Sequence, residues 1–174
     1  MNQTEQSQRK QTIKDLVLDA AKLIEDTGEN AFDEFRQEGT RWFQGDTYVF
    51  VWMTNGVRVV YPLDPSGKEQ NMSTLLDASG KAIGRLFVDI VLSEEGEGGI
   101  DYRWPKPGET DPSSKQTYIK GVVSGEQVFL VGSGFYVETT EKVMNPLQYG
   151  AIIIENTVAV TGLFISVRKK RYFG

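Results

Sequence analysis

The sequence contains no cysteine and no histidine. The absence of cysteine excludes disulfides, thiol nucleophiles and thiolate metal sites. The absence of histidine removes the commonest general base and the commonest zinc ligand. Only an enzyme that works through carboxylates, or a site for a hard metal ion, stays open. We therefore expect a non-enzymatic protein with no catalytic residue, no bound metal and no cofactor.

Positive charge is also scarce, because the 174 residues carry a net charge of -5 at pH 7. The one strong basic cluster runs from Arg168 to Arg171. A protein that binds nucleic acid usually presents a basic face, so we expect no nucleic acid partner. A signal peptide is not visible either, because "MNQTEQSQRK" is polar and leads straight into an amphipathic segment. Either the protein stays in the cytoplasm or the N-terminus shown is not the natural one.

Apolar residues that recur at steps of three and four predict two main helices. The first covers residues 12–27, after a polar stretch at residues 1–11 that we expect to be frayed or disordered. A shorter helical piece follows with Ala31, Phe32 and Phe35. The second main helix covers residues 81–94, and a short helix is expected around Ser73–Leu76. The predicted buried positions are Ile13, Leu16, Val17, Ala20, Leu23 and Ile24 in the first main helix, and Ile83, Leu86, Phe87, Ile90 and Val91 in the second.

The stretch "DTYVFVWMTNGVRVVYP" contains two runs typical of β-strands around Asn55-Gly56, the strongest short hairpin signal. Its first run is apolar on both faces and should form an inner strand. Three more strands are expected at residues 100–104, 116–123 and 127–137, the last two joined by a turn at Ser124-Gly125. This element order places the helices on one side of an antiparallel sheet, which makes an α+β domain.

Five stretches in order resemble the single Cache domain, the PAS-like sensor module of chemoreceptors and histidine kinases. They are "DTYVFVWMTNGVRVVYP", "MSTLLDASGKAIGRLFV", "GEGGIDYRWPKP", "SKQTYIKGV" and "VFLVGSGFY". The resemblance covers residues 12–138 and is greatest to the second single-Cache subtype, including its stand-alone versions. It implies an antiparallel PAS/Cache-like sheet of five or six strands, with a long N-terminal helix on one face and a helix and loop on the other.

The resemblance also implies a function. Cache domains sense small molecules outside the cytoplasm, and they do so without chemical change to the ligand. A small metabolite, typically a carboxylate, is expected between the sheet and residues 63–92. Its binding shifts a terminal helix or strand, which passes the signal to a partner.

Seven residues are candidates for contact with such a ligand. By the resemblance, the aromatic pair of "GEGGIDYRWPKPG" faces the pocket, although core packing explains large aromatic residues on a sheet about equally well. A lysine at the pocket mouth suits a carboxylate, and the alternative is a solvated lysine at a strand end. The candidates are Tyr48, Phe50, Tyr61, Tyr102, Trp104, Lys115 and Tyr118.

Other polar residues receive structural interpretations. Alternation along its strand places Arg58 opposite Val57 and Val59, and we expect it to point outward rather than to hold an anion. Asp77 should form an Asx-type turn before a helix. Asp101 would serve a carboxylate enzyme only if another acid converged on it, and the acids at positions 94, 95 and 97 are expected in solvent.

Residues 139–174 lie beyond the resemblance. Ala151–Val167 is mostly apolar and precedes the basic cluster, which is typical of a membrane span. Glu155 and Asn156 interrupt this run, and a span needs about 20 apolar residues. Two added strands or a segment for self-association or protein partners is therefore slightly favoured. This extension supports an alternative function, a structural subunit that docks through residues 139–174 and binds no ligand.

Overall fold

The computed structural model describes residues 1–64 and 70–137. The chain divides into two units, residues 1–138 and 139–174. The second unit lies outside the described residues, and so do the alternatives of a membrane span or added strands for Ala151–Val167. Among the described helices, none combines the length and the apolar character that a membrane crossing requires.

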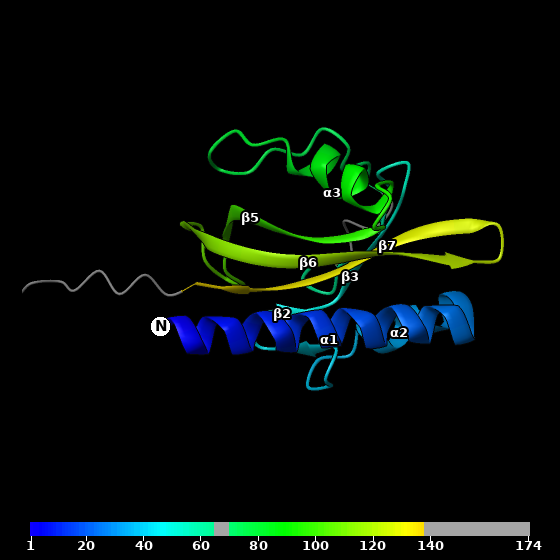
Figure 1. Ribbon diagram of the computed structural model, residues 1–174, viewed down its shortest axis with the longest axis horizontal. Helices are drawn as coiled ribbons and strands as arrows, with labels where there is room; N and C mark the ends of the chain where they lie inside the picture. Colours follow the sequence, from blue (N-terminus) through cyan, green and yellow to red (C-terminus); the bar gives the residue numbers. More distant parts are fainter. Residues whose placement is uncertain (65–69, 138–174) are drawn as a thin grey trace, which may run out of the picture. The chain divides into compact units, whose positions relative to one another are not determined.

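A five-stranded antiparallel sheet is the centre of the first unit, with strand order β4-β3-β7-β6-β5. It lies between the long helix α1 on one face and the helix α3 on the other (Figure 1). This arrangement confirms the predicted α+β fold. The strands are β3 (Phe50–Met53), β4 (Arg58–Val60), β5 (Glu97–Pro105), β6 (Pro112–Ser124) and β7 (Gln127–Tyr136).

Both predicted hairpins are present. β3 and β4 flank Gly56, which has a φ of 88° and so occupies the region that glycine tolerates best. β6 and β7 pair from Ser124 opposite Gln127 to Lys115 opposite Tyr136. β3 lies between β4 and β7 and is buried on both faces, as its apolar pattern predicted.

Helix α1 (Gln3–Thr27) begins nine residues earlier than the sequence indicated. The cause is a capping box, in which Asn2 and Glu5 accept each other's backbone N–H groups at 2.8 and 3.0 Å. Residues 3–11 are therefore helical, although their polarity suggested a frayed end. The face of α1 from Ile13 onward is buried against the sheet, where its apolar residues recur at helical spacing.

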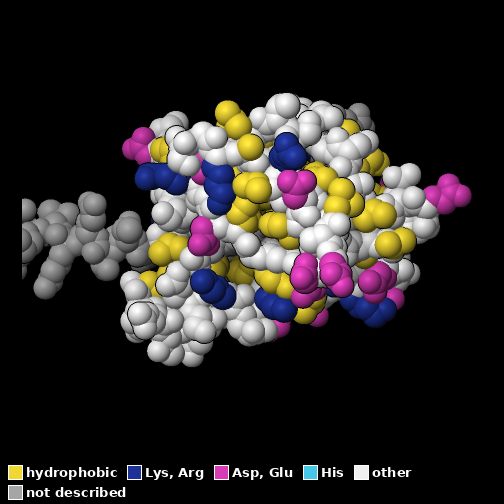
Figure 2. Space-filling view, turned by 45° about the horizontal axis from the view of Figure 1, so that its top comes forward, with side chains coloured by type: hydrophobic (Ala, Val, Ile, Leu, Met, Phe, Trp, Pro, Cys, Tyr) yellow, Lys and Arg dark blue, Asp and Glu magenta, His cyan; other side chains and the backbone are white. Residues whose placement is uncertain are grey.

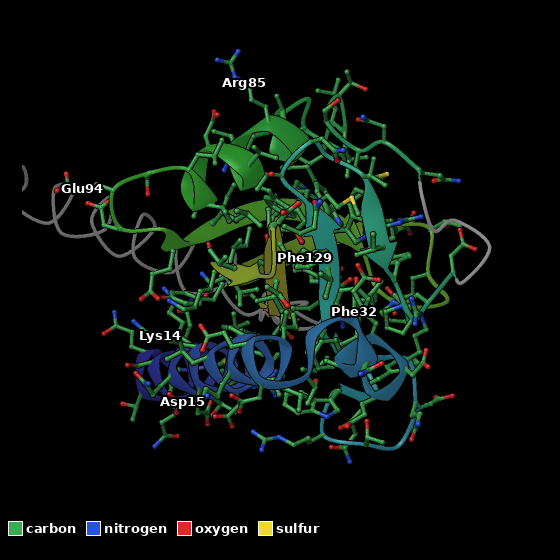
Figure 3. All side chains as sticks on the ribbon, turned by 90° about the vertical axis from the view of Figure 1, so that its right-hand side faces the viewer. Lys14, Asp15, Phe32, Arg85, Glu94 and Phe129 are labelled. Atoms are coloured by element: carbon green, nitrogen blue, oxygen red, sulfur yellow. The ribbon has the colours of Figure 1, made fainter. Side chains whose placement is uncertain are left out.

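Four short elements connect α1 to β3. They are η1 (Gly28–Asn30), α2 (Ala31–Phe35), β1 (Phe43–Gln44) and β2 (Thr47–Tyr48). Phe32 of α2 meets Phe129 of β7 edge to face, with ring centres 5.3 Å apart (Figure 3). The buried core on the α1 face of the sheet contains Leu16, Val17, Ala20, Ala21, Ile24, Ala31, Phe32, Phe35, Trp42, Val49, Val51, Val60, Val122, Phe129 and Val131.

The opposite face is covered by residues 70–82 and by α3 (Ile83–Val91). We call residues 70–91, which include α3, the cover segment. Arg85 on the outer side of α3 points away from the sheet (Figure 3). The outer surface of this side carries apolar atoms between charged side chains of both signs (Figure 2). The core beneath contains Phe43, Tyr48, Phe50, Trp52, Ile83, Phe87, Val91, Tyr102, Ile119 and Leu130.

The cover segment is hydrogen-bonded to the sheet at both of its sides. Met72 N–H donates to Gly56 C=O at 2.8 Å and Arg58 N–H to Gln70 C=O at 2.9 Å, beside β4. Ala78 N–H donates to Arg103 C=O of β5 at 3.3 Å. The short helix predicted around Ser73–Leu76 is absent, because Ser73 and Thr74 form a turn and Leu75 and Leu76 have no regular secondary structure.

Candidate functional site

The aromatic pair Tyr102 and Trp104 faces the cover segment, as the resemblance implied. Both lie on β5, two residues apart, and their ring centres are 6.3 Å apart. The hydroxyl of Tyr102 is buried and accepts a hydrogen bond from Thr117 Oγ1 at 3.1 Å. Both aromatic rings therefore belong to the layer between sheet and cover.

Five of the seven candidate residues surround one cavity, which we call the aromatic pocket. They are Tyr48, Phe50, Tyr61, Tyr102 and Trp104. Phe50 stacks on Phe87 of α3 at 5.8 Å, so the sheet and the cover meet through aromatic rings. The remaining lining residues, which the sequence did not single out for this role, are Trp52, Arg58, Met72, Leu75, Ile83 and Phe87.

The free volume of the aromatic pocket is about 30 Å³. One water needs about 10–15 Å³ measured in this way, so the space holds roughly two waters. The protein's own side chains therefore occupy most of the volume in which a ligand was expected.

Lys115, the sixth candidate, is buried beside this pocket rather than solvated at a strand end. Its side chain is 1% exposed, and its Nζ donates to Tyr48 Oη at 2.8 Å. The same nitrogen lies 4.2 Å from the centre of the Tyr48 ring and 4.8 Å from that of Tyr136. Its amine is thus enclosed by tyrosines, and Tyr136 is a further member of the site.

Burial controls the protonation of this cluster. It lowers the pKa of Lys115 to about 7, and the nearby carboxylate of Asp46 only partly offsets this effect. Burial also raises the pKa values of Tyr48, Tyr102 and Tyr136. At neutral pH the three tyrosines are therefore uncharged. Lys115 changes between its charged and uncharged forms near pH 7.

Tyr118, the seventh candidate, lies on the α1 face of the sheet and is not part of the pocket. Lys115 and Tyr118 are three residues apart on β6, and side chains an odd number apart on a strand point to opposite faces. The hydroxyl of Tyr118 donates to Glu97 Oε1 at 2.6 Å. Glu97 also accepts from Lys120 at 2.8 Å and from Lys14 of α1 at 3.4 Å, so this acid is not simply solvated.

The prediction that Arg58 points outward is wrong. Arg58 is 6% exposed and lines the aromatic pocket, with its guanidinium carbon 4.2 Å from the centre of the Tyr61 ring. The reason is a bulge: Val51 and Trp52 are adjacent on β3, yet pair with Val60 and Arg58. The extra residue between these partners turns Arg58 to the face that Trp52 occupies.

Asp77 forms the predicted Asx turn and also fastens the cover to the sheet. Its Oδ1 accepts from the backbone N–H groups of Ser79 and Lys81 at 2.8 and 2.9 Å, and its Oδ2 from that of Arg103 at 2.9 Å. Burial would raise the pKa of this carboxyl, but these hydrogen bonds outweigh it and hold the pKa far below its usual value. Asp77 therefore stays ionised and joins the cover to β5 beside Tyr102 and Trp104.

The arrangement gives no support to carboxylate chemistry. Asp101 is exposed, which removes the acid pair on which that hypothesis depended. Across residues 1–64 and 70–137, no group of three or more acidic side chains is placed to hold a metal ion.

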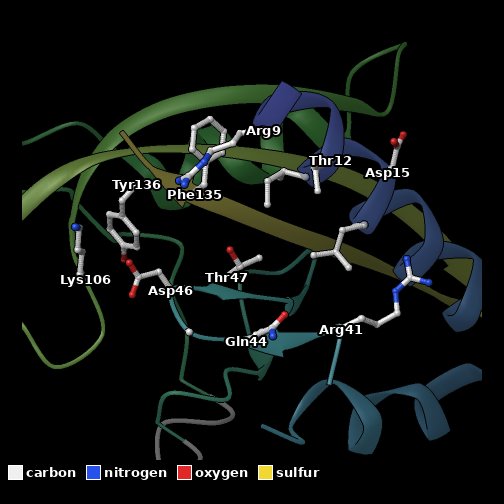
Figure 4. Close-up of a pocket in the computed structure, with 13 residues that line it drawn as sticks. Arg9, Thr12, Asp15, Arg41, Gln44, Asp46, Thr47, Lys106, Phe135 and Tyr136 are labelled. Atoms are coloured by element: carbon white, nitrogen blue, oxygen red, sulfur yellow. The ribbon is translucent and has the colours of Figure 1, made fainter. Parts of the chain in front are cut away.

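A larger groove of about 850 Å³ lies elsewhere, between α1, the β1–β2 turn and the end of β7 (Figure 4). Arg9, Arg41 and Lys106 line it together with Asp15 and Asp46. Arg41 is already paired with Asp19 of α1. Mixed and partly paired charge on an open surface is less suited to selective anion binding than a buried cation, so the aromatic pocket is the better candidate despite its small volume.

Comparisons with known proteins agree with this fold. A family model described as "Cache domain" matches residues 1–159. The solved structure "Periplasmic sensor domain of chemotaxis protein" has a TM-score of 0.66 and 27% identity, over 76% of this chain and 97% of that one. A second, "Structural basis for carboxylic acid recognition by a Cache chemosensory domain", has a TM-score of 0.60 and 27% identity, over 78% and 95%.

A curated relative is the methyl-accepting chemotaxis protein McpP of Pseudomonas putida, 27% identical over 99 residues. The match covers 57% of this chain and 18% of that protein, so the chain spans only a small part of the relative's length. The family match covers most of the chain, and the two solved structures share its fold. The chain therefore belongs to the Cache domain family, which confirms both the family resemblance of its motifs and the expectation of a sensor module rather than an enzyme.

Proposed function

We propose that this domain senses a small carboxylate, which binds in the aromatic pocket beside Lys115 and leaves unchanged. The observation that carries the proposal is the buried amine of Lys115. No carboxylate oxygen of the described residues lies within 4.0 Å of its Nζ, so its positive form has no ion-pair partner among them. A buried charge without a partner is costly, and a bound anion would offset that cost.

The surrounding groups suit a small organic acid. Lys115 and Arg58 lie on two sides of the contacting tyrosines Tyr48 and Tyr61, whose ring centres are 5.7 Å apart. Lys115 supplies the positive charge without a partner among the described residues, whereas Arg58 is already paired with Asp64 at 4.0 Å. Phe87 and Trp104 supply apolar surface. A mostly apolar pocket with a few polar groups is the usual composition of a ligand site. Carboxylic acid recognition is ascribed to the Cache chemosensory domain that shares 27% identity with this chain, which supports the same ligand class here.

The volume of about 30 Å³ sets a condition on binding. A carboxylate with two or more carbons needs more room than roughly two waters. Binding therefore requires the cover segment or the aromatic rings to move, and that movement is the change a sensor can transmit. We infer that the domain works outside the cytoplasm and passes occupancy to a partner domain, as the periplasmic and chemotaxis relatives suggest.

A thermal-shift screen with formate, acetate, lactate, succinate and citrate tests this function. A carboxylate at 100 times its Kd should stabilise the protein by about 2.7 kcal/mol. Lys115→Met should lose the shift, whereas Lys22→Met, which removes an exposed lysine of α1, should keep it. If none of the five compounds stabilises the protein, the carboxylate proposal is wrong.

The small pocket volume also favours a second function, a structural subunit whose pocket is filled by its own side chains. That subunit would dock through residues 139–174. Comparing the oligomeric state of the full chain with that of a chain ending at Val137 distinguishes the two. Loss of self-association in the shorter chain, without ligand binding in either, supports the docking function.

A further inference from the structure

The surroundings of Lys115 provide hydrogen-bond acceptors and ring faces but almost no negative charge. Tyr102 on β5 and Tyr136 on β7 occupy the cross-strand positions on its two sides, and Tyr48 of β2 accepts its hydrogen bond. Asp46, in the β1–β2 turn, is the acid whose charge reaches Lys115. Arg58 adds a second positive charge to the same pocket, and this charge is paired with the carboxylate of Asp64 at 4.0 Å.

Each of these contacts suits the uncharged amine as well as the ammonium ion. A neutral amine still donates one N–H to the Tyr48 hydroxyl, and its burial at 1% exposure then carries no charge penalty. The ammonium ion gains the two tyrosine ring faces, at 4.2 and 4.8 Å, but loses its hydration. The two forms are therefore close in free energy, in agreement with a pKa of about 7.

An anion bound beside Nζ stabilises the ammonium form of Lys115 and not the neutral amine, so it shifts the equilibrium toward the ammonium form. We propose, on the basis of the function proposed above, that the pocket takes up one proton with each carboxylate it binds, and that Lys115 is the acceptor. The proton comes from the solvent, adds to the neutral Nζ and forms the ammonium ion, and the carboxylate binds as the anion. The site thus binds the equivalent of an undissociated acid.

This coupling gives the sensor a response to pH as well as to the carboxylate. Well above pH 7, each unit of pH should weaken binding about tenfold, because one proton must be taken up from an ever scarcer supply. Below pH 6, Lys115 is already protonated, and binding should no longer depend on this group.

Isothermal titration calorimetry with acetate tests the coupling. Titrations of the full chain at pH 8 in Tris and in phosphate, which differ in ionisation enthalpy, give the number of protons taken up. We expect about 0.9 proton per acetate at pH 8 and about 0.1 at pH 6, from a pKa near 7. The panel carboxylate that stabilises most replaces acetate if acetate itself gives no shift.

Lys115→Arg provides the decisive variant, because arginine keeps its charge at every pH used. This variant should bind the carboxylate without proton uptake, and its affinity should not fall tenfold with each pH unit above 7. Lys22→Met should match the unmodified protein in both respects. Carboxylate binding with no proton uptake at pH 8 would overturn this inference and leave the proposed function intact. Absence of binding by every panel compound at pH 6 would overturn both.

Discussion

Lys115 Nζ touches Tyr48 twice, since it lies 4.2 Å from the centre of the ring and donates to its hydroxyl at 2.8 Å. One tyrosine thus supplies both the ring face and the hydrogen-bond acceptor for a buried amine. The relationship joins β6 to β2, which are 67 residues apart in sequence. The pocket therefore contains a titratable amine whose burial lowers the free energy of unfolding only at pH values where the amine is charged.

Lys115→Met should stabilise the protein by about 1–4 kcal/mol at pH 6, where the lysine is charged and buried without an ion-pair partner among the described residues. Its folded pKa, about 7, lies below the ordinary value of 10.5. The unfolded chain therefore holds more protons between these two values, and the free energy of unfolding of the unmodified protein should rise with pH there. Urea unfolding from pH 6 to 10 measures both effects. A variant that is less stable at pH 6, or keeps the same pH slope, contradicts this assignment.

Trp104→Ala should weaken carboxylate binding more than it weakens folding. Trp104 is only half-buried, so we expect a loss of about 1–2 kcal/mol in the free energy of unfolding, less than for a fully buried tryptophan. Acetate affinity should fall at least tenfold. Calorimetry and urea unfolding on the same variant compare the two losses. A variant that fails to fold would show that Trp104 belongs to the core.

Asp77→Ala should release the cover segment from β5. The carboxylate accepts hydrogen bonds from three backbone N–H groups and from Ser79 Oγ, and we expect a loss of about 2–4 kcal/mol. Hydrogen exchange should speed up at the amides of Ser79, Lys81 and Arg103. Asp101→Ala, at an exposed acid on the same strand as Arg103, is the matched control. If the hydrogen-exchange rate of the Arg103 amide is unchanged in Asp77→Ala, Asp77 does not hold the cover segment on β5.

Glu97 should stabilise the junction of α1 with the sheet in a pH-dependent way. Hydrogen bonds from Lys120 and Tyr118, with Lys14 adding to them, lower its pKa from 4.5 to about 2. The stabilisation is therefore present above pH 4.5 and is lost as the pH falls toward 2. We expect Glu97→Gln to lose about 1–2 kcal/mol at pH 7 and to show a flatter decline in acid. Urea unfolding of both proteins between pH 2 and pH 7 measures this difference. If the free energy of unfolding falls equally with decreasing pH in both, the ionised Glu97 does not stabilise this junction.

Gly132→Ala should disturb the aromatic pocket from below. A methyl group at this position would overlap the ring of Phe50, which lies directly over the glycine. Overpacking of this kind costs about 1–3 kcal/mol, and the displaced ring would enter the remaining 30 Å³. Both the melting temperature and acetate affinity should fall. Gly99→Ala meets only an ordinary contact with Thr117 C=O, so a loss of the same size there would show that the effect is not specific.

Sequence patterns were sufficient for the sheet and its two faces. Apolar alternation around Phe50 and the turn signals at Gly56 and Gly125 predicted the hairpins. The two-residue turn Gly125–Glu126 also fixes the register, so counting back along both strands places Tyr136 opposite Lys115. The turn predicted at Ser124-Gly125 lies one residue earlier, and the same count from it sets Gly134 opposite Lys115, so Tyr136 was missed. The alternation along β6 alone is enough to exclude Tyr118 from the face that Lys115 occupies.

Other features depend on contacts that no local pattern reveals. The bulge that turns Arg58 into the pocket arises from pairing with Trp52, and bulges have no strong sequence signal. The capping box of Asn2 and Glu5 was readable, but the polarity of the following residues concealed it. The volume of the pocket depends on how rings from four elements and from Tyr61, just after β4, pack together, which composition cannot indicate. The ligand residues themselves stay a prediction.

The cover segment binds the sheet through Gln70 and Met72 at β4 and through Asp77 and Ala78 at β5, the two outermost strands. One stretch of chain thus occupies main-chain donors and acceptors along both borders, where a neighbouring molecule would otherwise add a strand. If ligand entry lifts this stretch, those groups become available for a short time. Solubility at high concentration should then depend on how firmly the stretch is held, and a released variant should form intermolecular β-structure first.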